Sequence, residues 1–235
     1  MRLQRTWLCL LLIAAIPLTV FSGSDQRMLN AWLEYQEIYE FGHIGLGYKV
    51  FHGFIITNQG DKPVRIEKVS STCECNYAFA SDSTIAPGDS ISILMSFETT
   101  NYYGRTSRSV VVETDHPKVP EITFYHQSTI GQWYYNMKPD PISLFFLPGH
   151  SSRKIVLPNP DLERVELSGF EISHPHFDVK VVTGETDRGG QLELEILPRA
   201  ELKAGTHLSS LTLTVKLPGE AKDYVLTIPV KIARF

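Results

Sequence analysis

The feature that most constrains the fold of this chain is an alternation of apolar residues with a period of two. It is clearest at residues 90–97, where apolar side chains at every second position alternate mostly with serine. Such alternation indicates a strand with one buried face and one solvent face. Similar runs lie at 110–112, 177–181, 192–196, 211–215 and 226–232. In the first half of the chain, the alternation predicts these core residues: Phe54, Ile56, Ile66, Ile91, Ile93 and Phe97.

Turn-forming residues separate these runs. They include Asn58-Gln59-Gly60-Asp61, Pro87-Gly88-Asp89, Asp115-His116-Pro117, Gly189-Gly190 and Pro218-Gly219. Many short strands divided by such turns, with no long segment of helical period, favour an all-β sandwich. Only residues 26–40 could form a helix, and we interpret them as a segment that leads into the first strand. With 43% hydrophobic and 20% charged residues, the chain has enough apolar material for a core.

The second half of the chain repeats the pattern of the first. An apolar strand residue precedes Gly104, and apolar residues follow at the sixth and eighth positions; the same spacing recurs around Gly205. The two glycines lie about 100 residues apart, which is the length of an immunoglobulin-type sandwich. We therefore predict two tandem immunoglobulin-like β-sandwich domains, at residues 27–132 and 133–235.

The join between the two predicted domains is aromatic. It reads Trp133-Tyr134-Tyr135-Asn136-Met137, without the glycine and serine of a flexible linker. Large aromatic side chains are rarely left fully in water. We expect Trp133 or Tyr135 to be at least half buried against the second domain, with Phe145 or Phe146 as a neighbour.

Residues 1–22 have the pattern of an N-terminal signal peptide. Arg2 and Arg5 precede a short apolar run, and small residues follow at Ser22, Gly23 and Ser24. The run is shorter than the roughly 20 residues of a spanning helix, so we expect export to the periplasm or the extracellular space and no membrane span in the mature chain. Cleavage would change the formal net charge from −4 to −6, because two arginines and no acidic residue are removed. An acidic surface disfavours nucleic acid as a partner.

An ordered series of motifs resembles a known bacterial family. It begins with Tyr39-Glu40-Phe41-Gly42-His43-Ile44 and continues through Ser71-Thr72-Cys73-Glu74-Cys75, Ile85-Ala86-Pro87-Gly88 and Thr114-Asp115-His116-Pro117. Over residues 37–125 the chain resembles the domain-of-unknown-function family numbered fifteen-seventy-three, whose exported immunoglobulin-like domains are similar to ASH and major-sperm-protein modules. The second half is a looser immunoglobulin-like match. The resemblance implies a sandwich fold in the cell envelope; Glu74 and Asn76 stand where the family usually has glycine and threonine.

Cys73 and Cys75 are the only cysteines after the predicted signal peptide. On an extended strand, residues two apart lie about 6.6 Å from each other, too far for a disulfide, so a bridge requires a turn or bulge. Three interpretations stay open: structural thiols or a local disulfide, a redox-active pair, and ligands for copper or zinc. Two thiolates fall short of a closed tetrahedral metal site.

Other signs of chemistry are weak. His174-Pro175-His176 offers two imidazoles, but the proline favours a solvated turn over a metal site. Gly88-Asp89-Ser90-Ile91 is similar to a lipase nucleophile segment, yet it lies in a corner before a predicted antiparallel strand rather than in an α/β fold. We therefore predict no enzymatic activity and no cofactor.

The function that the sequence favours is binding of another envelope protein. Sandwiches expose sheet edges to which a partner segment can add by main-chain hydrogen bonds. Aromatic residues are enriched at contact surfaces, and Tyr102 and Tyr103 in the loop before Gly104 are the predicted contact residues. The alternatives are a thiol-redox or copper- or zinc-handling protein that uses Cys73 and Cys75, and a periplasmic assembly chaperone. The chaperone hypothesis predicts a groove between perpendicular domains with a basic anchor.

Overall fold

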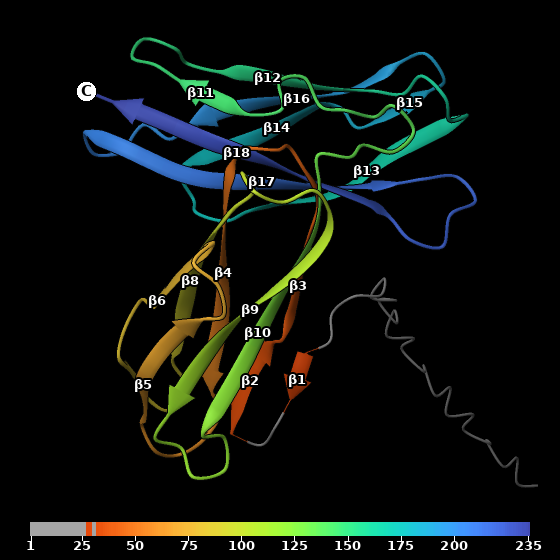
Figure 1. Ribbon diagram of the computed structural model, residues 1–235. Coiled ribbons are helices and arrows are strands. Elements are labelled where there is room, and N and C mark those ends of the chain that lie inside the picture. The colour runs from red at the N-terminus through yellow and green to blue at the C-terminus, as the bar shows by residue number, and fades with distance from the viewer. Residues whose placement is uncertain (1–26, 30–31) are drawn as a thin grey trace, which may run out of the picture.

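The computed structural model describes residues 27–29 and 32–235, and the predicted signal peptide lies outside the described residues. The fold is all-β, as predicted, and the described residues contain no helix. Accordingly, they include no helix that could cross a membrane. Figure 1 shows two β-sandwiches, with the strands of the second lying crosswise over one end of the first.

Two sheets pack face to face in the first sandwich. One sheet has, in spatial order, β1 (Arg27–Leu29), β2 (Leu33–Gln36), β4 (Lys49–Asn58), β8 (Ser90–Glu98) and β6 (Asn76–Ala80). The other has β3 (Ile38–Ile44), β10 (Glu121–Ile130), β9 (Gly104–Thr114), β5 (Val64–Ser71) and β7 (Thr84–Ile85). Because β2 and β3 follow each other directly but lie in different sheets, the chain changes sheets at this point.

The second sandwich repeats this arrangement. One sheet has β11 (Leu144–Phe146), β18 (Tyr224–Arg234), β17 (Gly205–Lys216), β13 (Arg164–Ile172) and β15 (Glu185–Asp187); the other has β12 (Arg153–Pro158), β16 (Gln191–Pro198) and β14 (Phe177–Thr183). The first strand of each large sheet runs parallel to the last, as β3 with β10 and β11 with β18. Gly104 and Gly205 open the equivalent strands β9 and β17, which confirms the repeat that the sequence predicts.

Two separate hydrophobic cores hold the sandwiches together. The first gathers buried residues between Leu33 and Ile130, and the second gathers buried residues between Met137 and Ile232. The six residues that the alternation places inside are all buried: Phe54, Ile56, Ile66, Ile91, Ile93 and Phe97. The predicted register of the first sandwich is therefore confirmed.

Main-chain pairing continues from one sandwich into the other. β18 runs parallel to β3, with Leu226 opposite His43 and Thr227 opposite Ile44, so that the two large sheets form one ten-stranded sheet. The approach requires glycine at position 42, where φ is 64° and a Cβ atom would lie 2.0 Å from the Val225 carbonyl oxygen. The Thr227 hydroxyl donates to the carbonyl of Phe41 at 2.6 Å.

The aromatic join packs against the second sandwich, as expected. Trp133 is partly buried on the second core, and Tyr135 is 37% exposed. The Tyr135 hydroxyl donates to Glu220 at 2.7 Å. Of the two phenylalanines predicted nearby, Phe146 belongs to the second core, whereas Phe145 is 55% exposed.

Candidate protein-docking site at the junction

One sheet of the first sandwich presents large apolar side chains to solvent, next to the outward serines of β8. We call the outward side of β4, β8 and β6 the outer face. Across it, Phe51 lies beside Ser96 and Tyr77, and Gly53 lies beside Leu94 and Phe79. The most exposed large side chains are Tyr77 at 63%, Phe79 at 60% and Ile55 at 51%. Such a surface is unusual, because the solvent side of an antiparallel sheet is normally polar.

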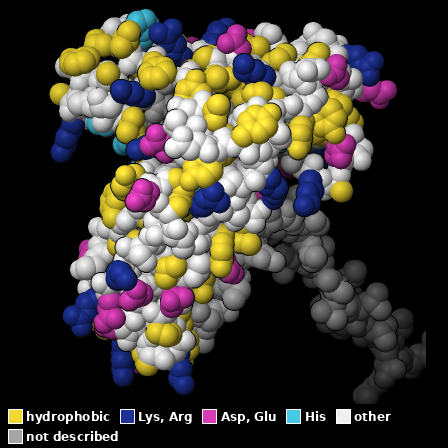
Figure 2. All heavy atoms as spheres, in the orientation of Figure 1, with side chains coloured by type: hydrophobic (Ala, Val, Ile, Leu, Met, Phe, Trp, Pro, Cys, Tyr) yellow, Lys and Arg dark blue, Asp and Glu magenta, His cyan; other side chains and the backbone are white. Residues whose placement is uncertain are grey.

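Charged residues border the outer face and do not interrupt it. Lys49 and Glu98 stand 3.9 Å apart where the face meets the second sandwich, and the Lys49 ammonium lies 5.4 Å from the centre of the Tyr77 ring. Figure 2 shows many charged side chains at the end of the first sandwich that points away from the second. On the side seen in this view, where β9 and β10 are nearest the viewer, hydrophobic side chains lie over the middle of the first sandwich and at the junction.

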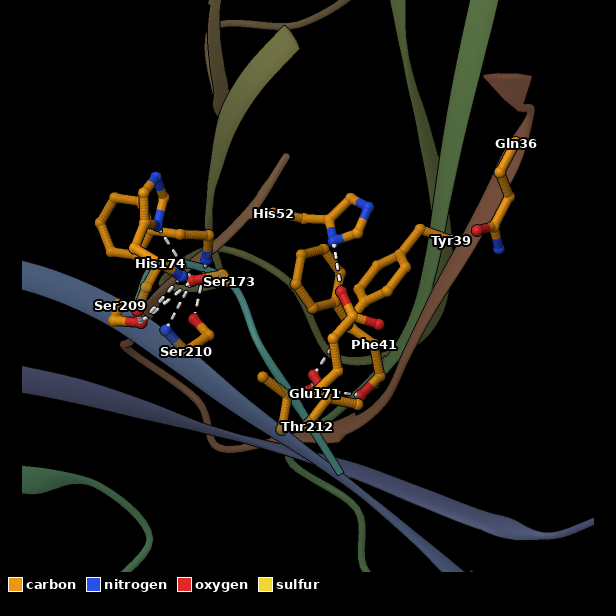
Figure 3. A network of polar contacts seen from close by, with 12 residues as sticks. Gln36, Tyr39, Phe41, His52, Glu171, Ser173, His174, Ser209, Ser210 and Thr212 are labelled. Atoms are coloured by element: carbon orange, nitrogen blue, oxygen red, sulfur yellow. Dashed lines mark hydrogen bonds and ion pairs between the residues drawn. The ribbon is translucent and has the colours of Figure 1, made fainter. Parts of the chain in front are cut away.

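A polar network joins the first sandwich to the second (Figure 3). The ring of His52 is stacked on that of Tyr39, with the centroids 3.5 Å apart. His52 Nδ1 lies 3.2 Å from the Glu171 carboxylate, and the Tyr39 hydroxyl donates to the hydroxyl of Thr212 at 2.9 Å. Burial, and then the negative charge of Glu171, raise the pKa of Tyr39.

Serine hydroxyls extend this network. Phe51 N donates to the Ser210 hydroxyl at 2.8 Å, and Ser210 N donates to the Ser173 hydroxyl at 2.8 Å. His174 N donates to the Ser209 hydroxyl at 3.2 Å. The main chain of β4 is thereby fixed to the loop that follows β13, as Figure 3 shows.

A groove of about 400 Å³ opens next to this network. It lies between β2, β4 and the end of β13, and it is lined by Glu34, Tyr35, Gln36, His52, Gly53, Phe54, Ile55, Thr57 and Glu171. The described lining includes two carboxylates and no lysine or arginine. The chaperone hypothesis predicts a basic anchor, and the described residues that line this groove supply none.

Cys73 and Cys75 are joined by a disulfide, with the Cα atoms 5.3 Å apart. The bridge is possible because residues 72–75 form a turn between β5 and β6 instead of an extended strand. Both cysteines are partly buried, and Cys75 packs against the first core. A bridged pair has no thiolate with which to ligate copper or zinc, so these residues do not form a metal site in this state. The described residues contain no cluster of three or more potential metal ligands.

The two tyrosines predicted as contact residues have different surroundings. Tyr102 is partly buried, packs on Phe97 with the ring centroids 5.7 Å apart, and lies under the Arg108 guanidinium. Tyr103 is 70% exposed. Only Tyr103 is therefore free to present its ring to a partner.

The sequence interpretation missed Tyr77 and Phe79, although a signal was present. In residues 76–80 the aromatic positions alternate with asparagine and alanine, and the small residues are the ones that face the core. If the larger residues were taken as the buried ones, the inward and outward faces of β6 would be exchanged. The partly buried packing of Ala78 and Ala80 on the core decides the orientation.

The histidines of His174-Pro175-His176 lie in a bend between β13 and β14 and are partly buried. Their rings are 5.7 Å apart, and the ring of His207 on β17 lies 5.0 Å from that of His176. Burial lowers the pKa of His174 and of His176. The segment is therefore less solvated than the sequence predicted.

In each half of the chain, two mostly antiparallel sheets pack face to face, and one parallel pair, β3 with β10 or β11 with β18, joins the first and last strands of the larger sheet. This arrangement defines the class: an immunoglobulin-like β-sandwich protein. The model of the family described as protein of unknown function (DUF1573) matches residues 34–126. The family resemblance expected for residues 37–125 is thereby confirmed. No curated protein matches the chain.

Several solved structures are similar at low identity. The secreted serine protease VesC from Vibrio cholerae is 14% identical, with 74% of this chain and 47% of that chain covered and a TM-score of 0.37. The chain thus spans about half the length of the protease. A protein of unknown function from Porphyromonas gingivalis is 12% identical, with coverages of 87% and 97% and a TM-score of 0.35. An ASH / PapD-like domain of human CEP192 is 14% identical, with coverages of 43% and 85% and a TM-score of 0.35.

Proposed function

We propose that this protein is a non-enzymatic, exported interaction module that binds another protein of the cell envelope through the outer face. The observation that carries the proposal is the exposure of Tyr77, Phe79 and Ile55 on a sheet face whose charged residues, Lys49 and Glu98, lie at one end. Burying such side chains is favourable by roughly 25 cal/mol per Å² of apolar area removed from water. Exposed apolar patches bordered by polar residues mark interaction sites.

Two further observations support this function and its location. Hydrogen bonds and strand pairing across the junction hold the outer face in a fixed position relative to the second sandwich. A partner would therefore meet one preformed surface, which lowers the entropic cost of binding. A disulfide between Cys73 and Cys75 fits an oxidising compartment such as the periplasm or the extracellular space.

The test is site-specific photo-crosslinking in intact cells of the native host. A photoreactive phenylalanine analogue at position 79 should give a discrete adduct with one envelope protein. The same analogue at Tyr125, which is 37% exposed on the other sheet of this sandwich, is the matched control and should give none. Tyr77→Glu should abolish the adduct from position 79. Equal crosslinking from both positions, or an adduct that survives Tyr77→Glu, would contradict the proposal.

A thiol-redox function is the second candidate, because the disulfide lies in an exposed turn whose middle residue, Glu74, faces solvent. It requires that the bridge be reduced and re-formed during the reaction. This candidate predicts that a Cys73→Ser, Cys75→Ser double variant loses its function in the host. The interaction proposal predicts that this variant keeps the adduct from position 79.

A further inference from the structure

The strand β6 is the last strand of its sheet and has one open edge. It pairs with β8 along its whole length, from Asn76 to Ala80, and no described strand pairs with its other side. Val69 of β5 and Ala80 of β6 line a groove of about 430 Å³ beside this edge. The edge therefore faces a hollow at the surface and not a neighbouring strand.

Two hydrogen bonds that continue the pairing with β8 show which main-chain groups point to the open edge. Glu98 N donates to the carbonyl of Cys75 at 3.0 Å, and Ser81 N donates to the carbonyl of Ser92 at 2.8 Å. Main-chain direction alternates along a regular strand, and the register of β6 with β8 has no bulge. The odd-numbered residues of β6 therefore direct their N–H and C=O groups to β8, and the even-numbered residues direct theirs to the open edge.

The even-numbered residues of β6 are Asn76, Ala78 and Ala80. Asn76 N donates to the carbonyl of Cys73 at 3.3 Å. The main-chain groups of Ala78 and Ala80 have no hydrogen-bond partner among the described residues. The open edge thus presents donors and acceptors with the spacing of an antiparallel strand.

The strands that end the other rows of paired strands are protected against such association. β14 has Asp178, Lys180 and a bulge near its end, and β12 has Arg153, Lys154 and Pro158. β1, β7, β11 and β15 are only two or three residues long. Charge, proline, bulges and short length are the usual means of blocking an edge. β6 has five residues and no charge, proline or bulge.

The sequence of β6 is complementary to a second copy of itself. If two antiparallel copies meet with Ala78 on the twofold axis, all five residues pair, and Tyr77 of each copy lies opposite Phe79 of the other. On the outer face, these pairs are aromatic cross-strand pairs, which stabilise antiparallel sheets. They belong to the type of pair that exchanges no hydrogen bonds and has the closer Cα spacing. On the inward side, the small side chain of Ala78 faces its own copy and leaves room for the approach.

We propose that two copies of this protein associate through the open edge of β6, in antiparallel register about Ala78. The N–H and C=O groups of Ala78 in one copy bond to those of Ala78 in the other, and the N–H of Ala80 donates to the carbonyl of Asn76. The two outer faces then form one continuous surface. This inference goes beyond the proposed function, because the occupant of the edge is a second copy of this chain and not another envelope protein.

Sedimentation equilibrium of the mature protein tests the association. The mass should be that of two chains and should fall toward that of one chain on dilution. Ala78→Pro removes the N–H at the open edge without affecting the hydrogen bonds of β6 to β8, and it should weaken association at least tenfold. Ala78→Ser keeps this N–H and is the matched control. A single-chain mass at every concentration, or unchanged association of an Ala78→Pro protein with native circular dichroism, would overturn the proposal.

Two single-cysteine variants test the register without a change to the main chain. Tyr77→Cys and Phe79→Cys place thiols directly opposite each other only when the two variants are mixed, at the Cα spacing of about 4.5 Å that a disulfide accepts. Oxidation of the mixture should therefore give a covalent dimer, and each variant alone should give much less. The natural cysteines are bridged to each other and do not compete. Equal yields from the mixture and from each variant alone, or no covalent dimer from the mixture, would contradict this register.

The two proposals fail in different ways. A crosslink from position 79 to a second copy has the mass of two chains, which separates it from an adduct with another envelope protein. A protein that sediments as one chain but still gives the envelope-protein adduct overturns the dimer and leaves the proposed function standing. A dimer that gives no such adduct does the reverse.

Discussion

The imidazole of His52 lies almost flat on the phenol ring of Tyr39, with the ring planes inclined by 16° and the centroids 3.5 Å apart. Both residues belong to the first sandwich, and each contacts the second: His52 through Glu171 and Tyr39 through Thr212. The two stacked rings are buried at the junction, and both residues contact the second sandwich. Because of these contacts and the strand pairing of β3 and β18, we expect the two sandwiches to keep one arrangement in solution.

Small-angle scattering of the mature protein should therefore fit a single arrangement of the two sandwiches. The physical reason is that opening the junction would break hydrogen bonds and expose the buried His52 and Tyr39 rings. Trp133→Ser should lower stability, because Trp133 packs on the second core, whereas Tyr134→Ser, at a side chain 52% exposed, should change it little. Scattering that requires a broad set of interdomain angles would contradict this prediction.

The core of the first sandwich should respond to substitution according to the register. Phe97 is fully buried, so Phe97→Ala should lower the free energy of unfolding by about 3–5 kcal/mol. Ser92→Ala, on the outer face of the same strand, should change it by no more than about 0.5 kcal/mol. Denaturant melts measure both, and equal effects would show that the register is wrong.

His126 should make the protein less stable as the pH falls. Burial, and then the charges of Arg108 and His52, lower the pKa of His126 to about 3. Because the unfolded chain takes up this proton near pH 6.5 and the folded protein does not, the stabilisation is present above about pH 6.5 and is lost between about pH 6.5 and 3. Between pH 7 and pH 4, the free energy of unfolding measured in urea melts should fall by about 3 kcal/mol more for the wild type than for His126→Gln. If the free energy of unfolding depended on pH in the same way in both proteins, His126 would not be the source of the pH dependence.

The mature protein should contain no free thiol before reduction. Thiol titration should give no reaction in either native or denatured protein, and two thiols after reduction, because Cys73 and Cys75 are bridged. The loop they close is short, so Cys75→Ser should lower stability by about 2 kcal/mol or less. Two thiols that react without prior reduction would show that the cysteines are free.

Export should yield a mature chain that begins near Gly23 or Asp25. The basis is the charged start, the apolar run and the small residues of the predicted signal peptide. Intact-mass measurement of protein purified from the native host would show the cleaved chain. A mass that includes Met1 would be inconsistent with cleavage.

Local patterns in the sequence are enough to predict the strands and their inward faces. Alternation with a period of two fixes which side chains can share a core, because successive strand residues point to opposite sides. Phe54, Ile93 and Phe97 are buried for this reason. The repeat around Gly104 and Gly205 likewise follows from local spacing, since each glycine opens an equivalent strand.

The candidate site, in contrast, depends on how strands that are distant in the chain meet in space. The groove exists because β2 leaves β4 and Glu171 of the second sandwich comes to its edge, and no local pattern records a contact between residues so far apart in the chain. The Cys73–Cys75 bridge depended in the same way on a turn that breaks the extended spacing. The orientation of Tyr77 and Phe79 was decided by packing, because Ala78 and Ala80 fit the space beside the first core. The alternation of residues in the sequence specifies which face of a strand is buried. The packing of strands that are distant in the chain determines which residues surround that strand.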